Sequence, residues 1–569
     1  MMRAIIKIRN RVPFQIKLIF FAFTLIALLS LSCSEKRASQ TQRDYLTPDV
    51  MCGTVEFTDG CSPKLDTLIR FGIALIHHMT YEDAEYTFNK VIELDKDCFW
   101  GYWGKAMTYV HPLWPDIPDN KTLNDGFILC QNALKLAQTK KEKLYGNAIA
   151  AYFNDGVNKT EPERLTAFNE GWELAAKELP DDVEAQLFHV LSMLATVSPN
   201  DKTYKVQLEA GAICEKILEK IPDHPGAFHY AIHAYDVPPL APKAKRVAEN
   251  YYKIAPELPH ALHMPTHIFT RLGYWQESID LNLRSADAAK KIPINGQISG
   301  QYFHALDYCL YAYLQQSEYK EAKQIADLVD TLSGTFEPSP VTAYALAAIP
   351  GRVALEYHNW KEAANLSLIH PEFPWNRFPQ YEALVYFAKG IGAGRSGNPQ
   401  AALQSYQKLE ELQNSFKNYE ADKYWIGQIE IQKEVVKAWQ LFAQGDKEKS
   451  LETMIKAADL EDATEKNPVT PGSLLPAREM LGDLYLEMNR PKNALIQYEL
   501  SLKSCPNRFN SLYGAGKSAE LTGDKEKAKF YYSALEKINK SSGPVRRQME
   551  HVKIVTDIKR DQKPEVGNQ

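Results

Sequence analysis

The sequence LGDLYLEMNRPKNALIQYELSLKSCP at residues 481–506 decides the fold class. Small residues stand at Gly482 and Ala494, where two paired helices would touch, and the aromatic residues Tyr485 and Tyr498 would fill the space between them. The same pattern returns 34 residues later, at Gly516, Ala528 and Tyr532. A fixed period of this length is typical of repeated helix–turn–helix units that stack on one another.

The helical pattern extends outward from this stretch. From residue 65 onward the chain lacks extended β-alternating runs, and Gly72, Ala84 and Phe88 form a similar unit near the front. Turn-plus-helix signals recur between the two ends, as LGYWQESID, SEYKEA, YHNWKEA, GNPQAAL and GDKEKSL. We therefore expect an all-α solenoid of about nine or ten helical hairpins. Five irregular, proline-bearing stretches are expected to be loops: 111–125, 237–243, 291–300, 334–340 and 371–378.

The repeat resembles the tetratricopeptide (TPR) family, most clearly at Leu481–Gly482, Tyr485, Ala494, Tyr498 and Pro506. The resemblance covers most of residues 65–540. The segments HPGAFHYAIHAYD and HALHMPTHIFTRLG are similar to those of uncharacterised bacterial TPR lipoproteins. This resemblance implies a solenoid whose first helices line a concave face, and it implies a protein or peptide partner.

The N-terminus has the pattern of a lipoprotein signal peptide. Basic residues precede an apolar run of twelve at 18–29, which is short for a membrane span. The run leads to LLSLSC, and Cys33 is followed by polar residues. This resembles a lipobox, although Ser30 stands where leucine is usual; an uncleaved anchor and ordinary secretion stay open as alternatives. We expect lipidation of Cys33 and a location in the bacterial cell envelope, facing the periplasm or the outer surface.

Domain organisation follows from these signals. We expect a signal peptide at 1–32 and a tether with a short loop at 33–64. An N-terminal TPR-like array would follow at 65–333, degenerate TPR-like hairpins at 334–475 and a tandem TPR at 476–540. Residues 541–569 would form a polar tail, disordered after 552.

Composition excludes one class of partner, and the cysteines suggest one bond. A formal charge of −5 over 569 residues gives no broad basic field, so we expect no nucleic-acid partner.

In an oxidising compartment Cys52 and Cys61, which bracket GTVEFTDG, are candidates for a local disulfide. The remaining cysteines of the body are expected to be buried thiols: Cys98, Cys130, Cys214, Cys309 and Cys505.

Histidines concentrate between residues 224 and 304. Seven of the fourteen histidines lie there: His224, His229, His233, His260, His263, His267 and His304. The pairs His229/His233 and His263/His267 both have the spacing His-x-x-x-His, which places two imidazoles on one helix face. The two pairs are also 34 residues apart. One histidine face is therefore predicted twice, on consecutive repeats.

The register of the TPR family implies that these side chains line a concave, ligand-binding groove. His260, His263 and His267 fall on its second, fifth and ninth positions, and Arg271 follows. His304 and Asp307 take the second and fifth positions of the next repeat, and His229 and His233 the fifth and ninth of the preceding one. His77 and His111, also 34 apart, take the thirteenth position of the first two repeats.

Neutral imidazoles favour a metal site, holding zinc or another divalent transition metal. The predicted ligands are His229, His233, His263 and His267, with Asp236 and Asp307 as further ligands or as groups that orient the imidazoles. Pro265 is expected to kink its helix. Two alternatives stay open: a polar groove for an organic or peptide ligand, and a purely structural role.

No catalytic residues are assigned. The HExxH, GxSxG, Walker and GxGxxG signatures are absent. Asp236, Glu257, Arg271 and Asp307 are the available groups for a metal-dependent enzyme, but no reaction follows from them. The favoured interpretation is a binding protein of the envelope that uses a histidine-lined groove. The alternatives are a metal-dependent enzyme with the same histidines and a pure assembly scaffold.

Overall fold

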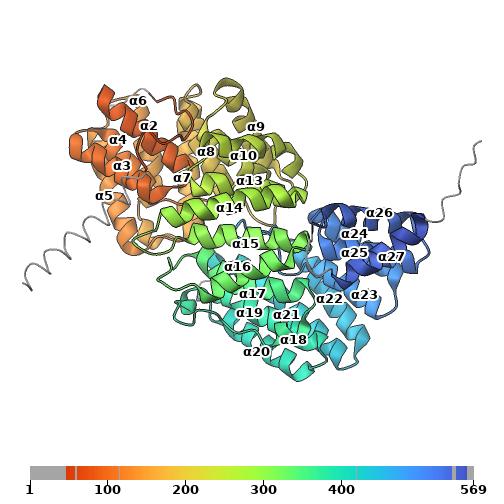
Figure 1. Cartoon of the computed structure of the whole chain (residues 1–569). Coiled ribbons are helices and arrows are strands. Elements are labelled where there is room, and N and C mark those ends of the chain that lie inside the picture. The colour runs from red at the N-terminus through yellow and green to blue at the C-terminus, as the bar shows by residue number, and fades with distance from the viewer. Residues whose placement is uncertain (1–45, 58–60, 115, 418, 541–545, 561–569) are drawn as a thin grey trace, which may run out of the picture. The chain divides into compact units, whose positions relative to one another are not determined.

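The computed structural model describes residues 46–57, 61–114, 116–417, 419–540 and 546–560. The described residues from 50 onward belong to one compact unit, which is the unit described below. Its described part consists of helices with short connections and contains no named strand, only isolated bridges such as Ile298–Phe336. The all-α prediction is confirmed (Figure 1).

The first part of the chain holds the helices that carry the front repeats and the first histidine pair. They are α2 (Pro63–His77), α3 (Tyr81–Leu94), α4 (Phe99–Met107), α5 (Asn120–Leu136), α6 (Lys140–Phe153), η1 (Gly156–Asn158), α7 (Glu161–Glu178), α8 (Val183–Ala195), α9 (Lys205–Lys220) and α10 (Pro225–Tyr235). Thr139 and Thr160 each begin a helix with a capping box, in which their side chains and a glutamate three residues later satisfy free backbone N–H groups.

The middle part carries the remaining histidines of the cluster. Its helices are η2 (Ala241–Ala244), α11 (Lys245–Ile254), α12 (Pro259–His263), α13 (Pro265–Leu272), α14 (Trp275–Lys291), α15 (Gly300–Gln315), α16 (Tyr319–Thr331), α17 (Pro340–Glu356) and α18 (Trp360–Ala364). Many helices in the chain begin with proline in the first turn, where its missing N–H costs nothing. Gly273 ends α13 in a left-handed conformation, at φ +68°.

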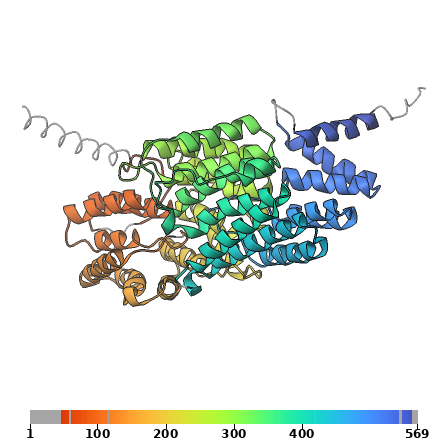
Figure 2. The same cartoon turned by 90° about the horizontal axis from the view of Figure 1, so that it is seen from below.

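The last part contains the clearest repeats. Its helices are η3 (Trp375–Arg377), α19 (Pro379–Arg395), α20 (Pro399–Asn414), α21 (Tyr419–Ala443), α22 (Lys447–Asp462), α23 (Ala477–Glu487), α24 (Pro491–Ser504), α25 (Phe509–Leu521), α26 (Lys525–Ile538) and α27 (Arg547–Arg560). Consecutive helices pack against one another along the chain (Figure 2). A Cβ at Gly482 would lie 2.8 Å from the Tyr498 ring, and one at Gly516 would lie 2.5 Å from the Tyr532 ring. The small and aromatic residues of the signature therefore meet as predicted.

Helix α27 corrects one prediction. The polar tail expected at 541–569 contains this helix. Disorder was expected after residue 552, but the chain is helical as far as residue 560. Met549 and Val552 are buried. Two apolar side chains one turn apart give the helix a face to pack, and the polar composition of its neighbours hides this signal.

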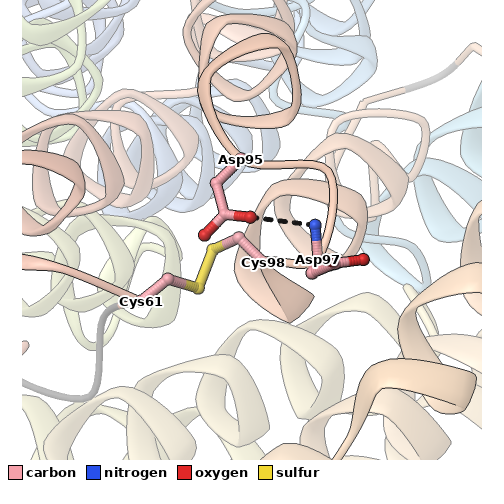
Figure 3. Close-up of a disulfide and its surroundings, with 4 residues drawn as sticks. All are labelled: Cys61, Asp95, Asp97 and Cys98. Atoms are coloured by element: carbon pink, nitrogen blue, oxygen red, sulfur yellow. Dashed lines mark hydrogen bonds between the residues drawn. A yellow bond between two sulfur atoms is a disulfide. The ribbon is translucent and has the colours of Figure 1, made fainter.

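The disulfide also differs from the predicted one. Cys61 is bonded to Cys98, which directly precedes α4 (Figure 3). Cys52 is a free, buried thiol. The expected pairing of Cys52 with Cys61 is therefore wrong, as is the expectation of a free thiol at Cys98. Beside the bond, the backbone N–H of Asp97 donates to Asp95 Oδ1 over 3.0 Å and shapes the turn that presents Cys98.

Reducing this bond should cost stability. The bonded cysteines are 37 residues apart, and a loop of that length predicts a loss of about 3–4 kcal/mol in the free energy of unfolding. Urea unfolding of the protein with and without a thiol reductant measures the loss. Equal unfolding midpoints would contradict the bond or its contribution.

Candidate metal centre

Six histidines from four neighbouring helices meet in the interior. Helix α10 supplies His229 and His233, α12 supplies His260 and His263, α13 supplies His267 and α15 supplies His304. All are buried except His233, which is half-buried. The open, histidine-lined groove expected from the repeat register is therefore a closed cluster. Neighbouring helices cover the imidazoles that the register placed on a free face.

Proline shapes the helix that carries three of these histidines. Pro265 separates α12 from α13 at Met264, as the predicted kink requires, because proline has no N–H to continue the hydrogen-bond ladder. His260, His263 and His267 still follow one another at spacings of three and four residues. They consequently stay on one side of the interrupted helix.

The first triad consists of His229, His233 and His260, whose ligand atoms lie within 4.8 Å of one another. His229 donates from Nδ1 to the backbone oxygen of His77 over 2.6 Å, which leaves its Nε2 without a proton. That Nε2 lies 3.1 Å from Nε2 of His233. His260 uses Nδ1 toward Gln301 Oε1 at 3.3 Å, and its buried Nε2 has no hydrogen-bond partner.

The second triad consists of His263, His267 and His304 and meets the same distance limit. His263 donates from Nδ1 to Asn282 Oδ1 over 2.7 Å. The Asn282 amide nitrogen donates to the Ser278 backbone oxygen over 2.8 Å, so the oxygen side of the amide must face the imidazole. His267 donates from Nδ1 to Asp236 Oδ2 over 3.0 Å. The Nε2 atoms of His263 and His267 are 3.0 Å apart.

These contacts fix which ring nitrogen carries hydrogen. The acceptors at Nδ1 are a backbone carbonyl, an amide oxygen and a carboxylate, none of which donates. When neutral, His229, His263 and His267 then present lone pairs at Nε2. In the second triad two lone pairs face each other at 3.0 Å. In the first triad Nε2 of His233 lies 3.1 Å from Nε2 of His229 and is free to donate a hydrogen to it. A tetrahedral zinc ion with Zn–N of 2.0–2.1 Å would place two nitrogens about 3.3 Å apart. One nitrogen pair in each triad, at 3.1 Å and 3.0 Å, comes close to that spacing.

Burial keeps the cluster uncharged. It lowers the pKa of His233 and His260 to about 3 each, and it holds the pKa of His229, His263 and His304 well below the ordinary value. Neighbouring imidazoles lower these pKa values further. Neutral imidazole is the form that binds metal.

Acid should destabilise the metal-free protein. Burial also lowers the pKa of His78, outside the triads, to about 3. In the unfolded chain a histidine has a pKa near 6.5. Between pH 6.5 and pH 3 the unfolded state therefore binds protons at these histidines that the folded state does not bind. Stability is therefore lost as the pH falls below 6.5, and each of His78, His233 and His260 should cost about 2 kcal/mol between pH 7 and pH 5. Urea unfolding at the two pH values tests this, and equal stability would contradict it.

Asp236 is hydrogen-bonded to the second triad through His267; the sequence left open whether it would be a ligand or an orienting group. Its Oδ1 accepts from Arg271 Nε over 2.8 Å, its Oδ2 accepts from His267, and Lys466 Nζ lies 3.6 Å from Oδ2. Burial disfavours the charged carboxylate, but Lys466 and Arg271 outweigh burial and hold the pKa of Asp236 well below its usual range. Arg271 thus belongs to the site through Asp236.

Asp307 lies outside the cluster's contacts, contrary to the expectation. Its Oδ1 accepts from Arg352 Nε over 2.8 Å, and both side chains are fully buried. The repeat register could not identify Arg352 as the partner of Asp307, because Arg352 lies on α17, a helix further along the chain. Glu257, another candidate, is exposed on the surface.

A third group, the Glu184 cluster, was missed by the sequence reasoning. Its members His77, Glu184 and His224 are buried within metal-ligand distance of one another. Glu184 accepts from His77 Nε2 over 2.6 Å and from His224 Nε2 over 3.0 Å. The other ring nitrogens contact the Tyr230 hydroxyl and the Ala227 N–H. Every ring nitrogen has a partner, so this group is a complete hydrogen-bond network.

His111 is likewise separate from the triads. Its ring nitrogens face Asp116 Oδ2 at 2.6 Å and the Thr108 backbone oxygen at 3.0 Å, two acceptors that only an imidazolium satisfies. Burial opposes the charge, but Asp116 outweighs burial and raises the pKa of His111. The 34-residue spacing of His77 and His111 therefore does not place them in one site.

One comparison with known proteins identifies a repeat. Residues 475–508, which span α23 and α24, match the family model of the tetratricopeptide repeat. The α23–α24 hairpin is similar to a tetratricopeptide repeat. No curated protein matches the chain. Among solved structures, that of yeast Tom70 matches with 13% identity and a TM-score of 0.28, over 88% of this chain and 97% of Tom70, which is too weak to bear on function.

The cysteine proposed for lipidation, Cys33, lies outside the described residues, as does the whole apolar run before it. Among the described residues, none of the helices has the length and apolar character needed to cross a membrane.

Proposed function

We propose that this protein binds two transition-metal ions, one in each histidine triad. The observation that carries the proposal is the pair of facing Nε2 atoms in each triad, whose Nδ1 atoms are committed to acceptors in three of the four rings. In the second triad the two facing lone pairs repel, and a metal ion between them would remove the repulsion. The partnerless Nε2 of His260 supplies a third nitrogen in the first triad.

The ligand chemistry favours zinc, copper, nickel or ferrous iron, because imidazole suits these ions. Three protein ligands leave a fourth position open on a tetrahedral ion. A metal-dependent enzyme would also need an acid or base at that position. Asp236 and Asp307 are both held in ion pairs, so we favour binding over catalysis.

The test is the metal content of the protein purified without chelator or affinity His-tag. After dialysis against Zn²⁺ and removal of free metal, elemental analysis should find two ions per chain. The proposal would be refuted if the protein retained no metal after dialysis against each of Zn²⁺, Cu²⁺, Ni²⁺ and Fe²⁺.

A second role, as a protein-interaction scaffold, is favoured by the C-terminal repeat. Large apolar side chains are exposed on this repeat and on the hairpin that follows it: Ile496 on α24 is 53% exposed and Phe530 on α26 is 67% exposed. We propose that a protein partner covers them. Photocrosslinking from position 496 or 530 in cells should trap one partner, and the same partner should be trapped when the triads are mutated. Failure to trap a specific partner at either position would count against the scaffold.

We also propose that the protein is anchored in the bacterial cell envelope through a lipid on Cys33. The Cys61–Cys98 disulfide supports an oxidising compartment, because such bonds persist mainly outside the cytosol. Metabolic labelling with an alkyne fatty acid should tag the protein but not its Cys33→Ser variant. Absence of label in both would contradict the anchor.

A further inference from the structure

We infer that residues 464–475 form a strap that occupies a peptide-binding groove of its own chain, and that a proline-bearing segment of a partner protein binds there in place of the strap. The strap has the sequence TEKNPVTPGSLL and lies between α22 and α23. The inference depends neither on bound metal nor on the exposed side chains of Ile496 and Phe530.

Side chains of distant helices hold the strap in the manner of a bound peptide. All of its residues are described, and none belongs to a helix or strand, which its two prolines disfavour. The Tyr308 hydroxyl lies 2.9 Å from the Pro468 backbone oxygen and 3.1 Å from that of Thr470. The Tyr424 hydroxyl accepts from the Asn467 N–H over 2.8 Å. These tyrosines come from α15 and α21, so helices remote in the chain bind the strap through its backbone.

Helix α17 recognises the middle of the strap through a hydroxyl and a carbonyl. The Tyr344 hydroxyl donates to Thr470 Oγ1 over 2.5 Å. Arg352 Nη2 lies 3.2 Å from the same oxygen and 3.0 Å from the Gly472 backbone oxygen. Arg352 is itself fixed by Asp307 at 2.8 Å, and both side chains are fully buried. The groove therefore presents donors at fixed positions, and a segment such as Pro-Val-Thr-Pro-Gly supplies the matching acceptors.

The strap leaves part of the groove empty. A cavity of about 70 Å³ is lined by the strap and by α17, α19 and α21. The strap contributes Asn467 and Thr470 to its wall, and Trp425 and Gln432 of α21 also line it. Gln432 is 9% exposed, and its buried Oε1 has no hydrogen-bond partner among the residues that the structure describes. Buried polar atoms are normally paired, so the strap is an incomplete ligand for this groove.

A partner segment has a route to the groove and a reason to displace the strap. The first five residues of the strap, 464–468, are all partly exposed, which leaves that end open to a competitor. Because the strap is tethered, it competes at an effective concentration of about a millimolar. A partner that carries the same proline-bearing sequence and also donates a hydrogen bond to Gln432 Oε1 would offset this advantage.

The test replaces residues 465–473 with a glycine–serine linker of equal length and adds a fluorescent peptide of residues 464–473 in trans. Fluorescence anisotropy should show saturable binding to this linker variant and at least about tenfold weaker binding to the unaltered protein, in which the tethered strap competes. Within the linker variant, Tyr344→Phe should weaken peptide binding about fivefold. Tyr319→Phe, on α16 and without a contact to the strap among the described residues, should leave it unchanged.

Each other result would overturn the inference. The peptide would fail to bind the folded linker variant, or would bind it and the unaltered protein equally, if the strap did not occupy a peptide site. Equal effects of Tyr344→Phe and Tyr319→Phe would show that the peptide binds outside the groove. Loss of native helix content in the linker variant, measured by circular dichroism, would show that the strap is part of the fold and not a replaceable ligand.

Discussion

Replacing His263 and His267 with alanine is expected to reduce the bound metal from two ions per chain to one. The two side chains provide facing Nε2 atoms 3.0 Å apart, and His304 alone would be left in the second triad. A single imidazole does not hold a divalent ion through purification, so the second site should empty while the first stays filled. Adding His229→Ala and His233→Ala should remove both ions. Elemental analysis of the three proteins measures this series.

The Glu184 cluster provides the matched control. His77→Gln and His224→Gln also remove two buried imidazoles within ligand distance of a shared partner, but those ring nitrogens are already hydrogen-bonded. This variant should keep two ions per chain as long as circular dichroism shows native helix content. Equal metal loss in a folded control and in the triad variant would show that the loss does not report on the triads.

Replacing Arg508 with alanine should produce the largest loss of stability, about 3–5 kcal/mol. Arg508 is fully buried and pairs with Glu356 at 2.6 Å and with Glu479 at 2.8 Å. Its Nη1 also donates to the Tyr311 hydroxyl over 3.1 Å. These partners come from α15, α17 and α23, so the arginine joins the C-terminal repeats to the middle of the unit. Its removal would leave two buried carboxylates unpaired. Urea unfolding measures the loss.

Arg490 forms an exposed ion pair and is the control for the buried Arg508. It contacts Glu448 at 2.7 Å, with side chains 41% and 69% exposed. Arg490→Ala should cost less than about 1 kcal/mol, because water and salt screen such a pair. If both arginine variants lost the same stability, burial would not be the source of the Arg508 contribution.

Sequence patterns were sufficient where the determinant is local. Helix period, the glycine and tyrosine positions of the repeat and the break at Pro265 depend on residues close together in the chain, and the structure agrees with each. The histidine pairs were found for the same reason, since a spacing of four residues places two side chains on one helix face. Asp236 was close enough in sequence to be named as a ligand or an orienting group for them.

Sequence patterns could not predict contacts between helices that are far apart in the chain. Nothing in the sequence around Glu184 marks it as the partner of His77 and His224, which lie 107 and 40 residues away. Arg352, 45 residues from Asp307, and Cys98, 37 residues from Cys61, were missed for the same reason. Burial of the histidines depends in turn on how neighbouring helices cover them, so the cluster could be predicted but its closure could not.

The most direct test of the two-ion centre is anomalous X-ray diffraction from crystals soaked with Zn²⁺, recorded at the zinc absorption edge. Two anomalous peaks are expected, one among the imidazole nitrogens of His229, His233 and His260 and one among those of His263, His267 and His304. Absence of a peak at both triads, or a peak at the Glu184 cluster instead, would contradict it.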